Sequence, residues 1–301
     1  MKKDHKNLRA TLAALFAQVI FGFSFLFTKL ALGVATPFIV LADRYLVAVI
    51  AMSLIIVISK TKLRFSRQFW KLMVMACFQP VLYFLFETYG IRMTTSSFSS
   101  VMIAMIPVVS MISGIFLLQE IPSFLQYVFT ALSVVGVSWM AFLGTSDGTV
   151  TPLGILLLSG AVVSSVCYNV MSRRLSSEFS PLERTYVMML TGFVVFMGVA
   201  LVENFKNPLV VFLPFTHTTF TGSVFYLGAV SSVLAFFLMN YANTYLPVSK
   251  TTVFSNFTTV VSVVAGVLFL QEPFSLQAFV AIALIIIGVG GAQLQTVKTK
   301  K

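Results

Sequence analysis

The stretch GIFLLQE at residues 114–120 returns almost unchanged as GVLFLQE at residues 266–272. Both copies end an apolar run in the same Leu-Gln-Glu triplet, although charged residues make up only 10% of the chain. An ungapped alignment of residues 97–140 with residues 249–292 gives fifteen identities in forty-four positions. The sequence therefore predicts an internal duplication.

Composition indicates a membrane protein. Hydrophobic residues make up 58% of the chain and its mean hydropathy is +0.97, whereas soluble domains are about 45–50% apolar and about 25% charged. A run of about 20 apolar residues can cross a bilayer as a helix, because a helix satisfies its own backbone hydrogen bonds in lipid. The sequence predicts ten such spans, at residues 9–32, 37–59, 69–90, 95–118, 123–143, 152–173, 180–203, 221–245, 249–270 and 274–295.

The earlier spans of the two halves also resemble one another, though more weakly. At an offset of 144 residues, Thr-Lys at 28–29 corresponds to Ser-Arg at 172–173. YFLFETYG at 83–90 resembles FFLMNYAN at 236–243 after a shift of one residue. Each half thus carries five spans, and because five is odd, the second copy enters the bilayer from the opposite face. Such inverted repeats are typical of alternating-access transporters, whose substrate site lies near the midplane between the halves.

We therefore predict an all-α polytopic membrane protein with ten transmembrane helices in two inverted five-helix repeats. The first repeat occupies residues 1–143, the second occupies residues 152–295, and a short basic cytoplasmic tail follows at 296–301. The longest connection, at residues 204–220, is too short for a soluble domain. The function is therefore expected among the helices.

Membrane topology, rather than a nucleic-acid partner, explains the net charge of +11. With a cytoplasmic N-terminus, sixteen of the twenty lysines and arginines fall on one side, and the opposite loops hold only Arg92 and Lys206. Basic residues concentrate in cytoplasmic loops. We therefore expect both termini in the cytoplasm, a lipid bilayer around the helices and no nucleic acid.

The chain lacks the patterns of an enzyme or of an ATP-driven pump. His5 and His217 lie outside the predicted spans, and neither H-E-x-x-H nor G-x-x-x-x-G-K-[ST] occurs. Cys77 and Cys167 are predicted to be small buried apolar residues. We expect no catalytic site, no metal and no cofactor, so that transport takes its energy from a gradient or from exchange.

The glutamates of the two repeated strings precede predicted hairpins. Glu120 is followed by Ile-Pro-Ser and Glu272 by Pro-Phe-Ser, so each lies just before the next helix. The positive end of that helix stabilises a carboxylate by about 0.3–1 kcal/mol. We interpret both as structural hairpin anchors on opposite sides of the membrane, in preference to proton carriers.

Several strings resemble the EamA-type members of the drug/metabolite transporter superfamily. They are FLFTKLAL at 25–32, Pro37 followed by Arg44 in the second span, and the long segments 99–120 and 248–272. The resemblance covers nearly the whole chain and implies ten helices in two inverted repeats. It also implies a multi-pass protein of the bacterial cytoplasmic membrane that exports or exchanges a small metabolite. Amino acids or related compounds are the first expectation, and lipophilic or cationic drugs are the second.

Other functions stay open beside metabolite export. A passive facilitator is an alternative, because a duplicated chain has two-sided access whether or not it couples transport to a gradient. An intramembrane enzyme is the least favoured reading. The sequence is also compatible with a homodimer, since Gly288, Gly290 and Gly291 on the tenth span permit a close helix contact.

Four charged residues lie near the outer third of the first three spans: Lys29, Asp43, Arg44 and Glu87. Each charge at membrane depth costs about 2.5–3.5 kcal/mol, so such residues face a cavity or a partner. We expect Arg44 to pair with Asp43 or Glu87, and Glu87 to be the titrating or cation-attracting group. Its repeat counterpart is Asn240, which cannot titrate, so coupling would be asymmetric between the halves.

Polar side chains inside the spans give the predicted substrate site. An isolated amide or hydroxyl in a span is often only an interhelical hydrogen bond, worth about 0.6 kcal/mol. Together they predict a polar path, and Pro80 favours a lined cavity because it leaves a backbone carbonyl free. The predicted substrate-binding residues are Gln18, Gln79, Tyr83, Glu87, Tyr168, Asn169, Asn240, Tyr241 and Asn256.

Overall fold

A computed structural model describes residues 2–60, 69–110, 113, 120–121, 123–146, 149–246, 254–272, 274–294 and 298–299. Apart from one pair of two-residue strands, its regular structure is helical, as predicted. Strand β1 (Glu120–Ile121) pairs antiparallel with β2 (Lys298–Thr299). This pairing joins the turn between the fourth and fifth predicted spans to the C-terminal tail. The helices of the first half are α1 (Lys2–Leu32), α2 (Pro37–Ser59), α3 (Phe69–Ala76), the π-helical η1 (Cys77–Leu82), α4 (Tyr83–Arg92), α5 (Ser96–Ile103) and α7 (Phe124–Ser146). Those of the second half are α8 (Pro152–Leu175), α9 (Pro181–Glu203), the 3-10 helix η2 (Pro208–Thr216), α10 (Thr218–Phe225), the π-helical η3 (Tyr226–Ala235), α11 (Phe236–Tyr245), α13 (Ser255–Leu270) and α14 (Leu276–Leu294).

Length and composition make this a multi-pass membrane protein. Among the described residues, six helices are long and apolar enough to cross a bilayer: Lys6–Leu32, Pro37–Ser59, Phe69–Arg92, Pro152–Leu175, Pro181–Glu203 and Thr218–Tyr245. Four shorter apolar helices follow the remaining predicted spans, at Ser96–Ser110, Phe124–Met140, Phe257–Leu270 and Leu276–Gly291. Parts of the fourth and ninth predicted spans lie outside the described residues.

Local sequence explains where several helices begin. Pro37, Pro152 and Pro181 each stand in the first turn of a helix, where the missing N–H has no intrahelical partner to lose. Ser180 and Glu183 form a complete capping box at the start of α9, which satisfies two otherwise free backbone donors. These starts agree with the predicted spans to within one residue.

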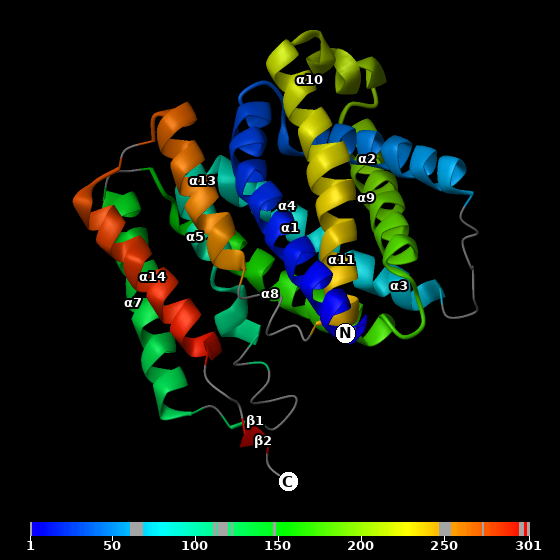
Figure 1. Cartoon of the computed structure of the whole chain (residues 1–301). Coiled ribbons are helices and arrows are strands. Elements are labelled where there is room, and N and C mark those ends of the chain that lie inside the picture. The colour runs from blue at the N-terminus through cyan, green and yellow to red at the C-terminus, as the bar shows by residue number, and fades with distance from the viewer. Residues whose placement is uncertain are drawn as a thin grey trace.

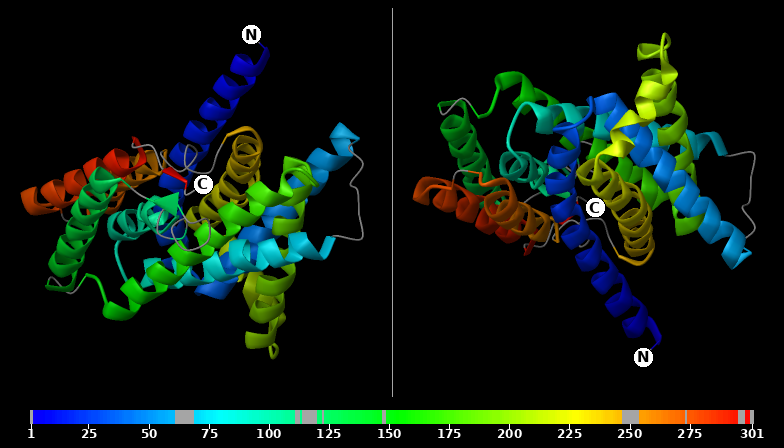
Figure 2. Two further views of the ribbon diagram at one scale, coloured as in Figure 1. Left: turned by 90° about the horizontal axis from the view of Figure 1, so that it is seen from below. Right: turned by 90° about the horizontal axis from the view of Figure 1, so that it is seen from above.

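The two halves are packed into each other. The most extensive helix contacts are α7 with α14, α2 with α9, α1 with α13, α4 with α8 and α1 with α11, and each pair joins one half to the other. Figure 1 shows α1 running through the middle of the bundle between α13 and α11. Figure 2 shows α7 beside α14 at one edge and α2 beside α9 at the opposite edge.

Glycines allow α7 and α14 to approach closely. A Cβ at Gly136 would lie 2.7 Å from Ile285 Cγ1, and a Cβ at Gly288 would lie 2.6 Å from both Phe129 O and Ser133 N. Gly136 and Gly288 are equivalent positions of the duplication, as are Ser133 and Ile285, so the contact is reciprocal. Gly288, which we expected to be available for a dimer, is therefore used inside the chain, and Gly291 packs likewise on the Phe129 ring.

Alanine at Gly288 is expected to lower the free energy of unfolding by about 1–2 kcal/mol, because its Cβ would meet backbone atoms of α7 that cannot move aside. Gly198→Ala on α9 is the matched control, since nothing lies within 4 Å of a Cβ there. Because alanine has a higher helix propensity than glycine, Gly198→Ala should not destabilise α9. Thermal unfolding of the detergent-solubilised variants measures the difference, and equal melting temperatures would contradict the packing.

Candidate functional site

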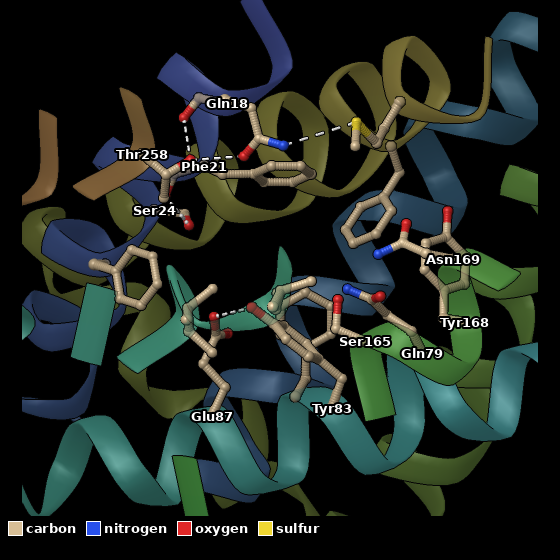
Figure 3. Close-up of a pocket in the computed structure, with 16 residues that line it drawn as sticks. Gln18, Phe21, Ser24, Gln79, Tyr83, Glu87, Ser165, Tyr168, Asn169 and Thr258 are labelled. Atoms are coloured by element: carbon tan, nitrogen blue, oxygen red, sulfur yellow. Dashed lines mark hydrogen bonds between the residues drawn. The ribbon is translucent and has the colours of Figure 1, made fainter. Parts of the chain in front are cut away.

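A pocket lies where helices of both halves converge (Figure 3). Its empty volume is about 640 Å³, part of which is open to the surroundings. Six aromatic side chains line it: Phe21, Phe25, Tyr83, Phe84, Tyr168 and Phe236. The polar lining consists of Gln18, Ser24, Gln79, Glu87, Ser165, Asn169 and Thr258, and Ile103, Ile106 and Met239 complete the wall.

The structure brings six of the nine predicted site residues together in this lining: Gln18, Gln79, Tyr83, Glu87, Tyr168 and Asn169. Asn240 lies outside the lining, and Tyr241 packs its ring 4.9 Å from that of Tyr245. The Asn256 side chain lies outside the described part of the chain.

Sequence reasoning missed Ser24, Ser165 and Thr258, which also line the pocket. Helical spacing provides a signal for one of them. Ser165 lies four residues before Asn169 and therefore on the same face of α8.

The carboxylate of Glu87 faces the pocket from α4. Glu87 is 4% exposed, and its Oε1 accepts a hydrogen bond of 2.7 Å from the Tyr83 hydroxyl, one helical turn earlier (Figure 3). Glu87 is the only ionisable carboxyl in the lining, and no Lys, Arg or His side chain of the described residues joins it there. The pocket therefore presents one acidic group among aromatic and amide side chains.

Gln18 and Gln79 place their amides at different parts of the pocket wall (Figure 3). Thr258 Oγ1 donates to Gln18 Oε1 at 2.7 Å and to Gln18 O at 2.8 Å, which joins α1 to α13. The backbone at Gln79 leaves the helical region, with φ −146° and ψ 114°. Gln79 Oε1 is buried and accepts no hydrogen bond from the described residues, so its hydrogen-bonding capacity is unused.

Asn240 supports the pocket wall through a polar network. Its Oδ1 accepts hydrogen bonds from the Tyr168 hydroxyl at 3.0 Å and from Ser172 Oγ at 2.8 Å. Its Nδ2 donates to Thr185 Oγ1 at 3.0 Å. The network connects α8, α9 and α11, and it holds the Tyr168 ring at the edge of the pocket.

The expected ion pair of Arg44 is not formed. Its Nε donates to Ser232 Oγ at 2.8 Å, its Nη2 donates to Ser231 Oγ at 3.3 Å, and its guanidinium lies 4.0 Å above the Phe84 ring. Asp43 is buried without a hydrogen-bond partner within the structure. The prediction failed because hydroxyls of η3, which are distant in sequence, satisfy the guanidinium.

Two cations bind the C-terminal ends of helices from other segments. Lys29 Nζ donates to Ile91 O at 2.8 Å and also to Thr94 O. Arg173 Nη1 donates to Asn243 O at 2.8 Å and to Thr244 O at 2.9 Å. The free carbonyls at a helix C-terminus carry partial negative charge, which cations stabilise. Lys29 and Arg173 are the positions that the duplication makes equivalent.

Glu272 anchors a different helix from the one expected. Its Oε1 accepts a hydrogen bond from Ser96 N at 2.7 Å, and its Oε2 accepts from Ser97 N at 3.0 Å and from Ser97 Oγ. The carboxylate therefore caps the N-terminus of α5 in the first half, rather than that of α14, which follows it. The side chain of Glu120 lies outside the described part of the chain.

The lining follows the duplication. The first half provides α1, η1, α4 and α5, and the second provides α8, α11 and α13, which derive from the corresponding spans. At equivalent positions of the duplication, a polar residue of one half mostly corresponds to an apolar or aromatic residue of the other, so the two halves line the pocket with different chemistry. The equivalent lining pairs are Phe21 and Ser165, Ser24 and Tyr168, Phe25 and Asn169, Tyr83 and Phe236, and Ile106 and Thr258.

The chain is similar over most of its length to proteins named as uncharacterized transporters. It is 33% identical over 301 residues to an uncharacterized transporter, YcxC, of Bacillus subtilis, covering 99% of this chain and 96% of that protein. It is 27% identical to YetK of the same organism, another uncharacterized transporter, over 98% of this chain and 89% of that one. An uncharacterized transporter of Archaeoglobus fulgidus is 25% identical over 89% of this chain and 92% of that protein.

A solved structure, described as a crystal structure of a protein, matches the fold with a TM-score of 0.64. It shares 18% sequence identity, and the match covers 95% of this chain and 98% of that one. The EamA-like transporter family matches the sequence twice, over residues 8–142 and again over residues 152–292. The two matches together span most of the chain, and the protein belongs to the EamA-like transporter family.

Proposed function

We propose that the protein is a secondary transporter that moves a small metabolite across the cytoplasmic membrane by alternating access. The observation that carries the proposal is the pocket itself, which is walled by equivalent helices of the two halves. A site between two such halves can open to either side as one half rocks against the other. Amino acids or related metabolites are the first class of substrate, and lipophilic or cationic drugs are the second.

The proposed topology has ten crossings, two inverted repeats at residues 1–143 and 152–295, and both termini in the cytoplasm. Two observations support it. Strand β1 and the turn between α13 and α14, which follow equivalent positions of the duplication, lie at opposite ends of the bundle (Figure 1). The close contact of α7 with α14 is reciprocal, as a twofold axis between the halves requires.

Accessibility labelling tests this topology with a matched pair of positions. Ser123 and Ser275 are equivalent residues of the two hairpins. In a background without Cys77 and Cys167, a membrane-impermeant thiol reagent should label Ser275→Cys in intact cells and Ser123→Cys only after permeabilisation. Labelling of both from the same face would exclude inverted repeats.

A second experiment tests transport. Extracellular metabolites are compared between cells that lack the protein and cells that overproduce it, and the compound whose export changes is then used in proteoliposomes. Internal unlabelled substrate should accelerate uptake of labelled substrate, because a carrier must return through its inward-facing state. An absence of acceleration would indicate a passive channel.

Glu87→Gln is expected to flatten the pH dependence of transport. Glu87 is the only ionisable carboxyl among the lining residues that the structure describes, and a buried carboxylate requires a proton or another cation to neutralise it. Counterflow in proteoliposomes across a range of pH values measures the effect, with the exposed Glu203→Gln as the control. A pH profile shared by Glu87→Gln and the wild type would show that coupling lies elsewhere.

A further inference from the structure

The lining of the pocket restricts the charge of its ligand. Among the described residues of the lining, the only charged group is the Glu87 carboxylate. The nearest guanidinium, that of Arg44, is bound to Ser231 and Ser232 and lies against the Phe84 ring outside the lining. The Tyr83 hydroxyl donates a hydrogen bond to this carboxylate but does not neutralise its charge, and a buried charge that is not neutralised is costly, so the complementary ligand carries a positive charge.

The hydrogen-bonding groups favour a donor at the same place. Gln79 lines the pocket from η1, and Tyr83 and Glu87 line it from α4, where they lie one helical turn apart on the same face. Figure 3 shows all three side chains on the lower wall of the pocket. The Tyr83 hydroxyl donates a hydrogen bond to the Glu87 carboxylate, and Gln79 Oε1 accepts no hydrogen bond from the described residues. This wall therefore offers acceptors, and an ammonium group has donors and no acceptor.

Aromatic rings occupy much of the remaining wall. Phe21, Phe25 and Phe236 line the pocket together with Phe84 and Tyr168. Ring faces attract cations within about 6 Å of the ring centroid, and they also provide apolar surface for the body of a ligand. The same rings offer no partner to an anionic group.

A free carboxylate on the ligand finds little to bind. The donors that face the pocket are neutral amides and hydroxyls, and Gln18 Nε2 already contacts Met239 Sδ at 3.9 Å. Carboxylates are normally bound by Arg, Lys or a cluster of backbone N–H groups, none of which lines this pocket in the described residues. An amino acid would bring its carboxylate into a site with an acidic group and no cation among the described lining residues.

We infer that the pocket binds a primary or secondary amine with a hydrophobic or aromatic body and no carboxylate. This rests on the proposed function, in which the same pocket is the substrate site, and it selects cationic amines over the amino acids that the family resemblance placed first. The ammonium lies at Glu87 and Gln79, and the apolar body lies among the phenylalanines.

Three probes with the same ring and different charges test the inference on the full-length protein in nanodiscs. They are 2-phenylethylamine, L-phenylalanine and 3-phenylpropionate, and isothermal titration calorimetry gives the affinity of each. The amine should bind at least about tenfold more tightly than the zwitterion, because the carboxylate of the zwitterion would be buried without a partner. The acid should bind most weakly.

Two variants locate the amine. Glu87→Gln should reduce the affinity for 2-phenylethylamine about tenfold or more, and Gln79→Leu should reduce it by a smaller factor. Glu203→Gln, an exposed position, should bind like the wild type. A melting curve for each variant distinguishes lost binding from lost folding.

Any one of the following results would overturn the inference. Tighter binding of phenylalanine or of the acid, equal binding of all three probes, no binding of the amine, or amine binding unchanged in folded Glu87→Gln would each do so. Transport is tested separately by the export comparison and by counterflow with the exported compound. If that compound is an anion or a zwitterion, the transporter stands and only the amine specificity fails.

Discussion

Replacing Arg184 by leucine is expected to lower the free energy of unfolding by about 3 kcal/mol or more. Arg184 is fully buried, and its guanidinium donates four hydrogen bonds of 2.6–2.9 Å to Ser172, Asn240 and Thr244. Each typically contributes about 0.5–1.5 kcal/mol, and acceptors left unsatisfied in the interior cost more. The three partners lie on α8 and α11, so a single side chain on α9 connects three helices of the second half.

Thermal unfolding in detergent measures this effect, and two variants refine it. Arg174→Leu removes an exposed arginine of the same region and should leave the melting temperature almost unchanged. Arg184→Lys should fall between the leucine variant and the wild type, because lysine keeps the charge but cannot reproduce the planar fork of donors. If Arg184→Leu and the wild type have the same melting temperature, the hydrogen bonds of Arg184 make no net contribution to stability.

The burial of Arg184 could not be predicted from the sequence. The sequence placed it among the cytoplasmic cations that set the topology, because it follows the predicted start of a span by a few residues. The structure buries it completely. Burial depends on Ser172, Asn240 and Thr244 arriving from other helices, and no spacing within α9 indicates that they will.

The helices themselves could be predicted more fully than the contacts between them. Apolar runs bounded by Pro37, Pro152 and Pro181 define helix starts locally, since a proline in the first turn acts through its own backbone. Gln79 and Glu87 were predicted as site residues because polar and charged side chains inside an apolar span face a cavity or a partner.

Partner choice over long distances could not be predicted. Arg44 was expected to pair with a neighbouring carboxylate, but it binds hydroxyls 187 and 188 residues away. Those serines lie in a π-helical segment whose position against α2 follows from packing, with Gly228 in contact with the Arg44 backbone. A sequence identifies a cation that needs a partner, while the fold decides which partner reaches it.

Glu272→Ala is expected to destabilise the protein by about 3 kcal/mol, because three hydrogen bonds to a carboxylate disappear together and two backbone donors of α5 lose their partner. Glu272→Gln keeps one acceptor oxygen and loses the charge, so its effect should be smaller. Glu203→Gln provides an exposed control. Melting curves rank the three variants, and an order in which Glu272→Gln is the least stable would contradict the capping role.

The same substitution should change access to the pocket, because the contact joins the turn after α13 in one half to the start of α5 in the other. In the proposed topology this turn lies on the outer face, where Lys29 also holds the end of α4. Loss of about 1.4 kcal/mol from the closed state raises the ratio of open to closed molecules tenfold. A cysteine at Ser24 in the pocket wall, in a background without Cys77 and Cys167, should therefore react faster with an external impermeant thiol reagent when Glu272 is alanine. An unchanged rate, with the expected loss of stability, would show that Glu272 holds the fold together without controlling the opening of the site.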